Sequence, residues 1–294
     1  MTELRPKIRC REIGVADLER IAELLSGGFA GRSRDYWMGG LQRQAVRDVP
    51  EGYPRFGYML DHAGVPVGVL LLIYSAREED GATAIRCNLS SWYVQPAFRN
   101  YAPMLTKIAQ RHKDVTYINV SAASWTWRII EAQGFRTYCS GLFVSFPALT
   151  RPARGMTVEI VSRHVREIEG LSASATALLA RHAAAGCLSL ICRTADNRTF
   201  PFILQPMRIR RGQFAPPAMQ LIYCDDIADF ITCAGALGRF LLWRGKIAVV
   251  LGANQRMPEL PGFYTEARGR KYFKGPHCPR LGDLSDTELV IYGP

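Results

Sequence analysis

The sequence lacks the features of several protein classes. Its longest apolar run, from Val65 to Tyr74, is about half of the roughly 20 residues that a transmembrane helix needs. The N-terminal stretch MTELRPKIRCRE has no apolar core of the kind found in a signal peptide. Its 8 cysteines form no Cys-x-x-Cys pair and no Cys/His spacing typical of zinc. We therefore expect no membrane span and no metal site, and a cytoplasmic protein with reduced thiols.

Positive charge is in excess, without a basic tail or an RNA-binding signature. The net charge is +11, of which +4 falls in residues 1–150 and +7 in residues 151–294. The basic residues are scattered, and the densest group is Arg208, Arg210 and Arg211. Such a field favours an anionic small molecule over nucleic acid as a partner.

Hydrophobic periodicity predicts an ordered series of elements in the first half of the chain. A tight turn at Ala63-Gly64 joins two of its strands. The series reads β-α-α-β-β-β-α-β-α-β. Its members are a strand at 8–12, helices at 15–26 and 35–46, strands on either side of the Ala63-Gly64 turn, a strand at 85–94, a helix from Pro103, a strand at 115–120, a helix ending at Gly134, and a strand at 138–146.

The second half repeats part of this order. A linker is expected at 149–156, because Pro147 lies just before this stretch and Pro152 within it. The pattern then predicts a helix at 171–185, strands at 187–193, 199–211 and 218–224, a helix at 227–243, and strands at 246–252 and 288–292. We expect domains at 1–148 and 157–294. The second is either a divergent copy of the first or an unrelated α+β domain.

The segment from Ser91 to Phe135 is the most informative. It contains SWYVQPAFRNYAPMLTKIAQ, VTYINV and SAASWTWRIIEAQGF, which read as strand, turn, helix, strand and helix. A helix that opens directly after a strand offers unpaired N–H groups to an anion. No acidic residue lies between Val94 and Arg111. The layout resembles the acyl-CoA-binding segment of the GNAT (Gcn5-related N-acetyltransferase) superfamily, although its motif is degenerate.

This resemblance implies an α+β or α/β architecture of two GNAT-like mixed-sheet domains in tandem. It also implies acetyl-CoA or another acyl-CoA as the co-substrate. Arg99 matches the start of the family's Arg/Gln-x-x-Gly-x-Gly/Ala turn, with Ala102 and Met104 in place of its glycines. Pro103 fits the first helical turn but removes one amide. The implied cofactor-binding residues are Tyr93, Val94, Arg99, Asn100, Tyr101, Ala102, Pro103, Met104 and Asn119.

The catalytic groups of the family are harder to match. Ile130 stands where many members have a tyrosine that protonates the departing thiolate, and the 85–94 strand has no carboxylate. Ser124 is one candidate donor, and Asn88 would orient an amine or a water. His277 or Glu288 would replace the acid/base if the tail folded over the cleft. Asp225 and Asp226 open the helix of the second half as caps, where they would repel a pyrophosphate.

The resulting hypothesis is an acyltransferase that moves an acyl group from coenzyme A to an amine of a small-molecule or peptide acceptor. The alternative is a catalytically silent tandem GNAT fold that binds a ligand or a partner. The missing tyrosine and glycines favour this alternative.

Overall fold

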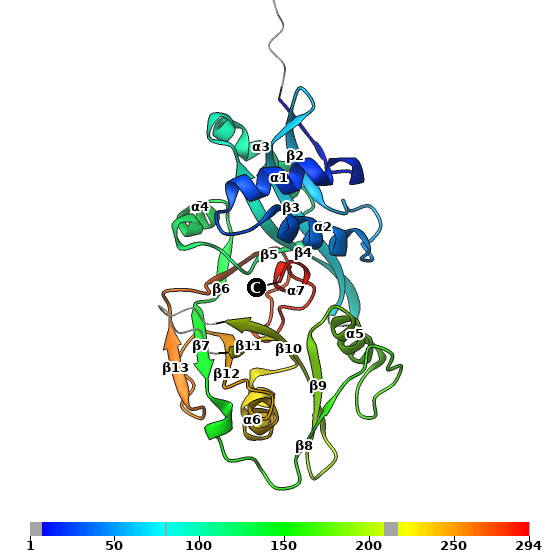
Figure 1. Cartoon of the computed structure of the whole chain (residues 1–294), viewed down its shortest axis with the longest axis vertical. Helices are drawn as coiled ribbons and strands as arrows, with labels where there is room; N and C mark the ends of the chain where they lie inside the picture. The colour runs from blue at the N-terminus through cyan, green and yellow to red at the C-terminus, as the bar shows by residue number, and fades with distance from the viewer. Residues whose placement is uncertain (1–7, 80, 209–216, 294) are drawn as a thin grey trace, which may run out of the picture. The chain divides into compact units, whose positions relative to one another are not determined.

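The computed structural model describes residues 8–79, 81–208 and 217–293 (Figure 1). The chain folds into two compact units. The first comprises the chain up to Asn119 together with Phe273–Cys278 and Asp286–Gly293. The second comprises Val120–Tyr272 and Pro279–Ser285. The boundaries expected at 148 and 157 both fall within the second unit. Each unit therefore combines segments that are far apart in sequence.

The first unit is built on a sheet with the strand order β1-β2-β3-β4-β5. Its strands are β1 (Arg9–Glu12), β2 (Gly57–His62), β3 (Val65–Glu79), β4 (Ala82–Val94) and β5 (Thr116–Asn119). Neighbours up to β4 are antiparallel, whereas β4 and β5 are parallel. The turn between β2 and β3 is the predicted one, with positive φ at Ala63 and Gly64. The strands predicted for this part of the chain are thus confirmed.

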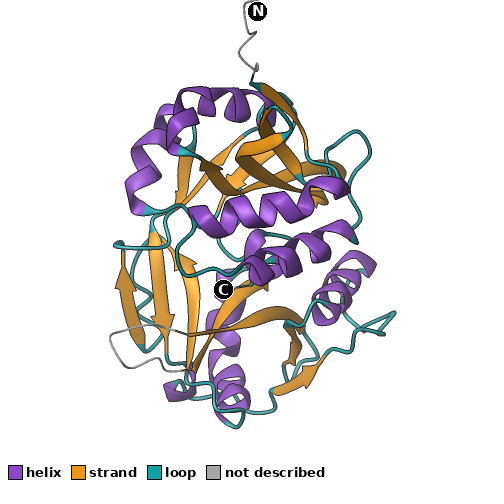
Figure 2. Ribbon diagram, turned by 45° about the horizontal axis from the view of Figure 1, so that its top comes forward, coloured by secondary structure: helices purple, strands orange, loops and turns teal. Residues whose placement is uncertain are grey.

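Two helices, α1 (Leu18–Gly28) and α2 (Arg34–Ala45), lie side by side across one face of this sheet (Figures 1 and 2). Their buried residues form one core with Met59, Val69, Leu71 and Ile73 of the sheet. The shorter α3 (Ala102–Ala109) packs against β2 and β3. The apolar residues that α1 and α2 share with the sheet are thus removed from water, and this burial stabilises a sheet covered by helices.

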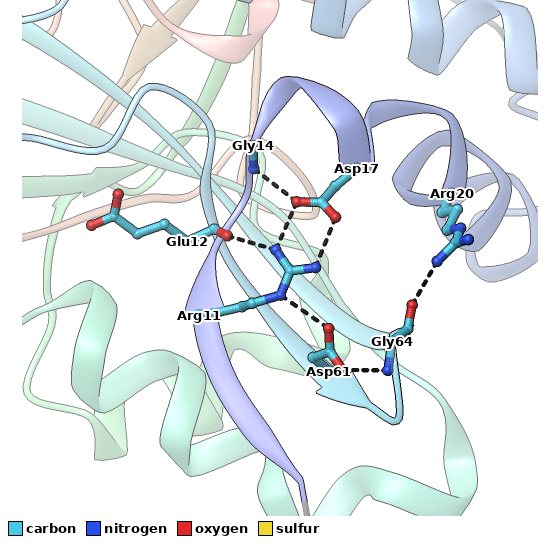
Figure 3. A network of polar contacts seen from close by, with 7 residues as sticks. All are labelled: Arg11, Glu12, Gly14, Asp17, Arg20, Asp61 and Gly64. Atoms are coloured by element: carbon cyan, nitrogen blue, oxygen red, sulfur yellow. Dashed lines mark hydrogen bonds and ion pairs between the residues drawn. The ribbon is translucent and has the colours of Figure 1, made fainter.

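An ion-pair network fixes the chain where β1 ends and the short 3₁₀ turn η1 (Val15–Asp17) begins (Figure 3). Arg11 donates two hydrogen bonds of 2.8 Å to the carboxylate of Asp17 and one of 2.9 Å to Asp61. Asp17 also accepts from the Gly14 N–H, and Asp61 from the Gly64 N–H. The two carboxylates thereby join β1, η1 and the β2–β3 turn.

The last element of the chain was predicted wrongly. Residues 288–292 were expected to form a strand, but Glu288–Ile291 is a short helix, α7. Ile291 of α7 and Tyr292, the residue after the helix, belong to the core formed by α1, α2 and the sheet. The Tyr292 hydroxyl donates to Gln44 Oε1 at 2.7 Å, and Arg43 donates to the carbonyl of Ile291. These tertiary contacts outweigh the strand preference of the β-branched sequence.

The second unit has a sheet in the order β13-β7-β12-β11-β10-β9-β8, in which β11 and β12 are parallel and the other neighbours are antiparallel. Its core lies between this sheet and α6 (Ile227–Leu242). The strands are β7 (Gly141–Ser145), β8 (Thr157–Ile160), β9 (Leu188–Arg193), β10 (Thr199–Arg208), β11 (Pro217–Cys224), β12 (Ala248–Ala253) and β13 (Gly262–Thr265). The remaining elements are η3 (Ser124–Thr126), α4 (Trp127–Ala132), β6 (Arg136–Cys139), η4 (Pro147–Leu149), α5 (Ala173–Ala184) and β14 (Lys271–Lys274).

Several expectations for this unit are confirmed. The strands at 187–193 and 218–224 and the helices at 171–185 and 227–243 are found within about two residues of their predicted ends. Asp226 caps α6, and its side chain accepts from the Ala228 N–H at 2.9 Å. Arg210 and Arg211, at the end of the strand expected to reach residue 211, lie outside the described residues.

The strand expected at 138–146 is in fact two strands. The strand is interrupted at Ser140, whose N–H donates to Asn254 Oδ1 at 2.7 Å instead of to a neighbouring strand. Gly141 lies so close to Thr265 that a Cβ there would come within 2.2 Å of its carbonyl oxygen. After this break, β7 lies between β12 and β13, so it does not complete the first half of the chain. No helix in the described ranges is both long enough and apolar enough to span a membrane.

Candidate functional site

The site is built where β4 and β5 separate. Their parallel ladder pairs Arg86–Asn88 with Thr116–Ile118, and β4 then continues to Val94. Asn88 lies at this point and is 2% exposed. Its Nδ2 donates to the carbonyls of Leu89 at 3.1 Å and Ile118 at 3.3 Å, and its Oδ1 accepts from the Glu288 N–H at 2.7 Å. The amide therefore joins both strands to the start of α7.

The second unit contains a matching arrangement. The parallel ladder of β11 and β12 pairs Ala218–Gln220 with Ala248–Val250, and β11 continues to Cys224. Gln220 Nε2 donates to the carbonyls of Leu221 at 3.3 Å and Val250 at 3.1 Å. Asn88 and Gln220 thus occupy the same place in β-β-β-α-β arrangements of the same order. In each unit, a side-chain amide satisfies carbonyl oxygens that the separating strands leave unpaired.

The two units differ in what lies beside the strand after this amide. In the second unit, Leu284 N–H donates to Ile222 O at 2.7 Å and Cys224 N–H donates to Gly282 O at 2.9 Å. The other edge of β11 is paired with β10 through Cys224, so residues 282–284 cover the edge that β12 leaves. Along β4, the described residues provide no backbone hydrogen bond of this kind between Leu89 and Val94. Beyond Asn88, the backbone of Leu89–Val94 thus has no backbone hydrogen-bond partner among the described residues on the side that β5 leaves, and we call this stretch the open edge of β4.

The backbone of β4 is irregular along this open edge. A bulge lies between the pairs Leu71–Ser90 and Val69–Tyr93, and Ser91 has a φ of 53°. The hydroxyls of Ser90 and Ser91 lie 2.9 Å apart. Trp92 Nε1 is buried and has no hydrogen-bond partner among the described residues. Bulges commonly redirect side chains next to functional sites. Sequence reasoning missed Ser91 and Trp92, because their alternation suits an ordinary strand.

The turn after β4 is tighter than expected. Pro96–Tyr101 form a 3₁₀ helix, η2, which leads directly into α3. The N–H of Ala102 donates to Arg99 O, so this amide is already used within the turn. The side chains of Arg99, Asn100, Tyr101, Pro103 and Met104 are exposed, and that of Ala102 is half-buried. This arrangement offers an anion the Arg99 guanidinium rather than a ring of free amides.

The remaining predicted cofactor-binding residues flank the open edge. Val94 is buried and pairs with Gly68, and Asn119 is the half-buried last residue of β5. Tyr93 packs on α1, where a Cβ at Gly28 would come within 2.6 Å of its ring. Its ring centroid lies 6.1 Å from that of Phe29. Tyr93 therefore serves chiefly to pack β4 against the helices.

The catalytic candidates differ in how they lie relative to β4 and β5. Asn88 uses both amide hydrogens in structural bonds, so it has no hydrogen left to donate to a substrate. The backbone of His277 donates to Thr116 Oγ1 at 3.2 Å, which places it beside the start of β5. Glu288, half-buried, follows the N-cap of α7 and is bonded through its N–H to Asn88. Ser124 is exposed at the start of η3 and belongs to the second unit.

Other ionisable groups that the structure describes near the sheet offer no reactive site. Burial raises the pKa of the Cys87 thiol and that of the Tyr74 hydroxyl, so both stay protonated at neutral pH. All 8 cysteines are free thiols, as expected. In the described part of the chain, no cluster of His, Cys, Asp and Glu is suited to hold a metal ion. Ile130 is buried, as its helical position predicts, but Ile129 is 49% exposed.

Comparison with known proteins identifies the fold. No protein-family model matches the sequence, and no curated protein matches it. A GCN5-related N-acetyltransferase from Kribbella flavida is 12% identical, with a TM-score of 0.57 over 93% of this chain and 72% of that one. Another from Anabaena variabilis is 11% identical, with a TM-score of 0.56 over 91% of this chain and 72% of that one.

The chain thus has the α+β fold of the GCN5-related N-acetyltransferases, with two mixed sheets. The fold class predicted from the Ser91–Phe135 segment is confirmed. These two structural neighbours are N-acetyltransferases by name.

Proposed function

We propose that the chain binds an acyl-CoA along the open edge of β4 and transfers its acyl group to an amine. The observation that carries this proposal is the contrast between β4, whose edge is open beyond Asn88, and β11, whose equivalent edge is covered by residues 282–284. An extended ligand with amide groups adds to such an edge as a further strand would. The pantetheine arm of coenzyme A has two amides of this kind.

The residues around this edge fit an acyl-CoA. The unpaired Trp92 Nε1 is a donor that a bound carbonyl would satisfy. Arg99 and Lys107 are exposed cations on η2 and α3, with no acidic residue between Val94 and Arg111 to oppose a phosphate. We assign phosphate binding to these side chains, with Tyr101 and Met104 exposed beside them. Asp225 and Asp226 would oppose a phosphate at the matching helix of the second unit.

In the proposed reaction the acceptor nitrogen attacks the thioester carbonyl carbon, and the carbon–sulfur bond breaks. The nitrogen loses a proton to a base, and the departing thiolate takes up a proton. We assign the base to Glu288, because its backbone is bonded to Asn88 at the separation of β4 and β5. Asn88 then acts as a positioning residue that fixes α7. His277, whose backbone is bonded to Thr116 of β5, is the candidate proton donor, and a small-molecule or peptide amine is the expected acceptor.

Titration calorimetry with acetyl-CoA tests the binding step. We expect one site per chain, and a gain of about 2.7 kcal/mol in unfolding free energy at a ligand concentration of 100 times Kd. Arg99→Gln with Lys107→Gln should weaken binding, whereas Lys113→Gln, a change at an exposed lysine beyond α3, should not. A folded sample that binds no acyl-CoA would refute the proposal.

Release of free thiol from acetyl-CoA across a panel of amines tests turnover. Glu288→Gln should lower kcat and leave acetyl-CoA binding intact. Binding without turnover for every amine would favour the silent ligand-binding module. The observation that favours the silent module is Ile130. This buried side chain has no proton to donate, and it stands where many GNAT enzymes have tyrosine.

A further inference from the structure

A second feature, unrelated to β4, lies within the second unit. A cavity of about 480 Å³ is lined by residues 151–156, by Val158 of β8, and by Ala236, Arg239 and Phe240 of α6. This volume is within the range of about 300–1,000 Å³ that is usual for small-molecule sites. No predicted function includes it, because the sequence pattern assigned residues 149–156 to a linker.

The wall of this cavity is fixed by close packing of that supposed linker on α6. A Cβ at Gly238 would lie 2.2 Å from Ala148 N, and one at Gly235 would lie 2.5 Å from Pro152 N. The two glycines therefore let the chain from Pro147 to Pro152 lie directly against the helix. Gly155, with a φ of 75°, then turns the chain into β8. The cavity is thus bounded by segments held in place by packing.

Three arginines line the cavity, and no acidic residue does. Arg151 and Arg154 come from the chain segment and Arg239 from α6. Within the described ranges, their guanidinium groups form no hydrogen bond or ion pair with the protein. Guanidinium groups bind carboxylate and phosphate in a planar, two-pronged geometry. Three uncompensated positive charges at one cavity create a field that attracts an anion.

The rest of the lining is apolar. Met156, Val158, Ala236 and Phe240 contribute side chains to the cavity, and Met156, Val158 and Phe240 also pack on the core of the unit. Ala236, Arg239 and Phe240 are spaced by three and four residues, so they share one face of α6. A ligand that only carried charge would leave this apolar surface exposed to water.

We propose that the cavity binds a small amphiphilic oxyanion, with a phosphate or carboxylate on the three arginines and an apolar body against Met156, Val158 and Phe240. Charge and apolar contact are both required, because each is provided by a different part of the lining. The site does not depend on acyl-CoA binding at β4, since its lining contains no residue of the first unit.

Titration calorimetry on the full chain with a matched ligand series tests this proposal. Naphthyl phosphate and naphthoate carry both parts, inorganic phosphate carries only the charge, and naphthol carries only the apolar body. We expect one of the two complete ligands to bind at a single site at least about tenfold more tightly than either partial ligand. The tighter of the two identifies the oxyanion as phosphate or carboxylate.

Substitution of the arginines locates the binding. Arg151→Gln with Arg239→Gln should weaken the better ligand by roughly a hundredfold and leave the thermal unfolding of the free protein unchanged, because both side chains are exposed. Arg166→Gln, at an exposed arginine outside the cavity lining, is the control and should bind as the wild type. No saturable binding of either complete ligand would overturn the proposal, as would equal affinity in the wild type and the double variant.

Discussion

Replacing Asn88 by alanine should destabilise the first unit strongly, although the substitution removes only a few atoms. The side chain is 2% exposed and serves three backbone groups at once: Leu89 O, Ile118 O and Glu288 N–H. Alanine provides no donor and no acceptor for them. The change therefore leaves two buried carbonyls and one part-buried N–H without their partner, while Gln220 of the second unit keeps its own bonds.

The size of the effect follows from these groups. An unsatisfied buried donor or acceptor costs about 1–3 kcal/mol, and partial relaxation of α7 recovers some of this cost. We expect a loss of roughly 3–5 kcal/mol in the unfolding free energy of the first unit, a large part of the 5–15 kcal/mol typical of a domain. At about 2–4 °C per kcal/mol, the first unit should unfold some 6–20 °C lower.

Urea unfolding and differential scanning calorimetry of the full chain measure this loss. The control is Ser124→Ala, at an exposed position without a capping bond, which should change stability by less than about 0.5 kcal/mol. Amide exchange locates the effect: protection should fall at β5 and α7 and persist at β12. A loss below about 1 kcal/mol for Asn88→Ala would refute the role assigned to this amide.

Three further results are expected. Gly238→Ala should destabilise by about 1–3 kcal/mol, because its Cβ would lie 2.2 Å from Ala148 N; Gly27→Ala, with nothing within 4 Å, should stabilise by about 0.5–1 kcal/mol, and the same sign for both in thermal unfolding would contradict this reasoning. The hydrogen bond from Arg11 lowers the pKa of Asp17, so this carboxylate stabilises the fold above its unfolded pKa of about 3.9 and loses that effect as pH falls through the folded pKa. Asp17→Asn should therefore lower the urea midpoint more at neutral pH than at about pH 2, and an equal loss at both would argue against it. Cys278 should be the one thiol that an aromatic disulfide reagent modifies rapidly in the native chain, because burial raises the pKa of Cys10 to about 11 and the other 6 thiols are buried; persistence of the fast phase in Cys278→Ser would contradict this.

Local signals were enough to predict most of the fold. The turn at Ala63-Gly64, the cap at Asp226 and the strand–turn–helix of Ser91–Phe135 each depend on residues close together in sequence. Elements decided by distant contacts could not be predicted in this way. The residues Glu288–Ile291 have a strand-like composition, and they are helical where Tyr292 bonds to Gln44, 248 residues away.

The candidate site was predictable only in part. The sequence indicated the region after β4, and the open edge lies there, but the role of Asn88 depends on Ile118 and Glu288, which are 30 and 200 residues away. The equivalence of Asn88 and Gln220 could not be predicted from the sequence. The two residues are of different types, and the residues on either side of them also differ. The 3₁₀ turn at Pro96–Tyr101 was likewise not predicted, because this segment was interpreted by its resemblance to the family motif. In this turn the Ala102 N–H donates to Arg99 O.

The noncontiguous make-up of the first unit also has a consequence for synthesis. Phe273–Cys278 and Asp286–Gly293 leave the ribosome after nearly the whole second unit has been made. Until then Gln44 and Asn88 lack their hydrogen-bond partners Tyr292 and Glu288. The unit that is translated first is therefore the last to reach its native form. A nascent chain stalled near residue 260 should therefore contain an incomplete first unit that is still sensitive to protease.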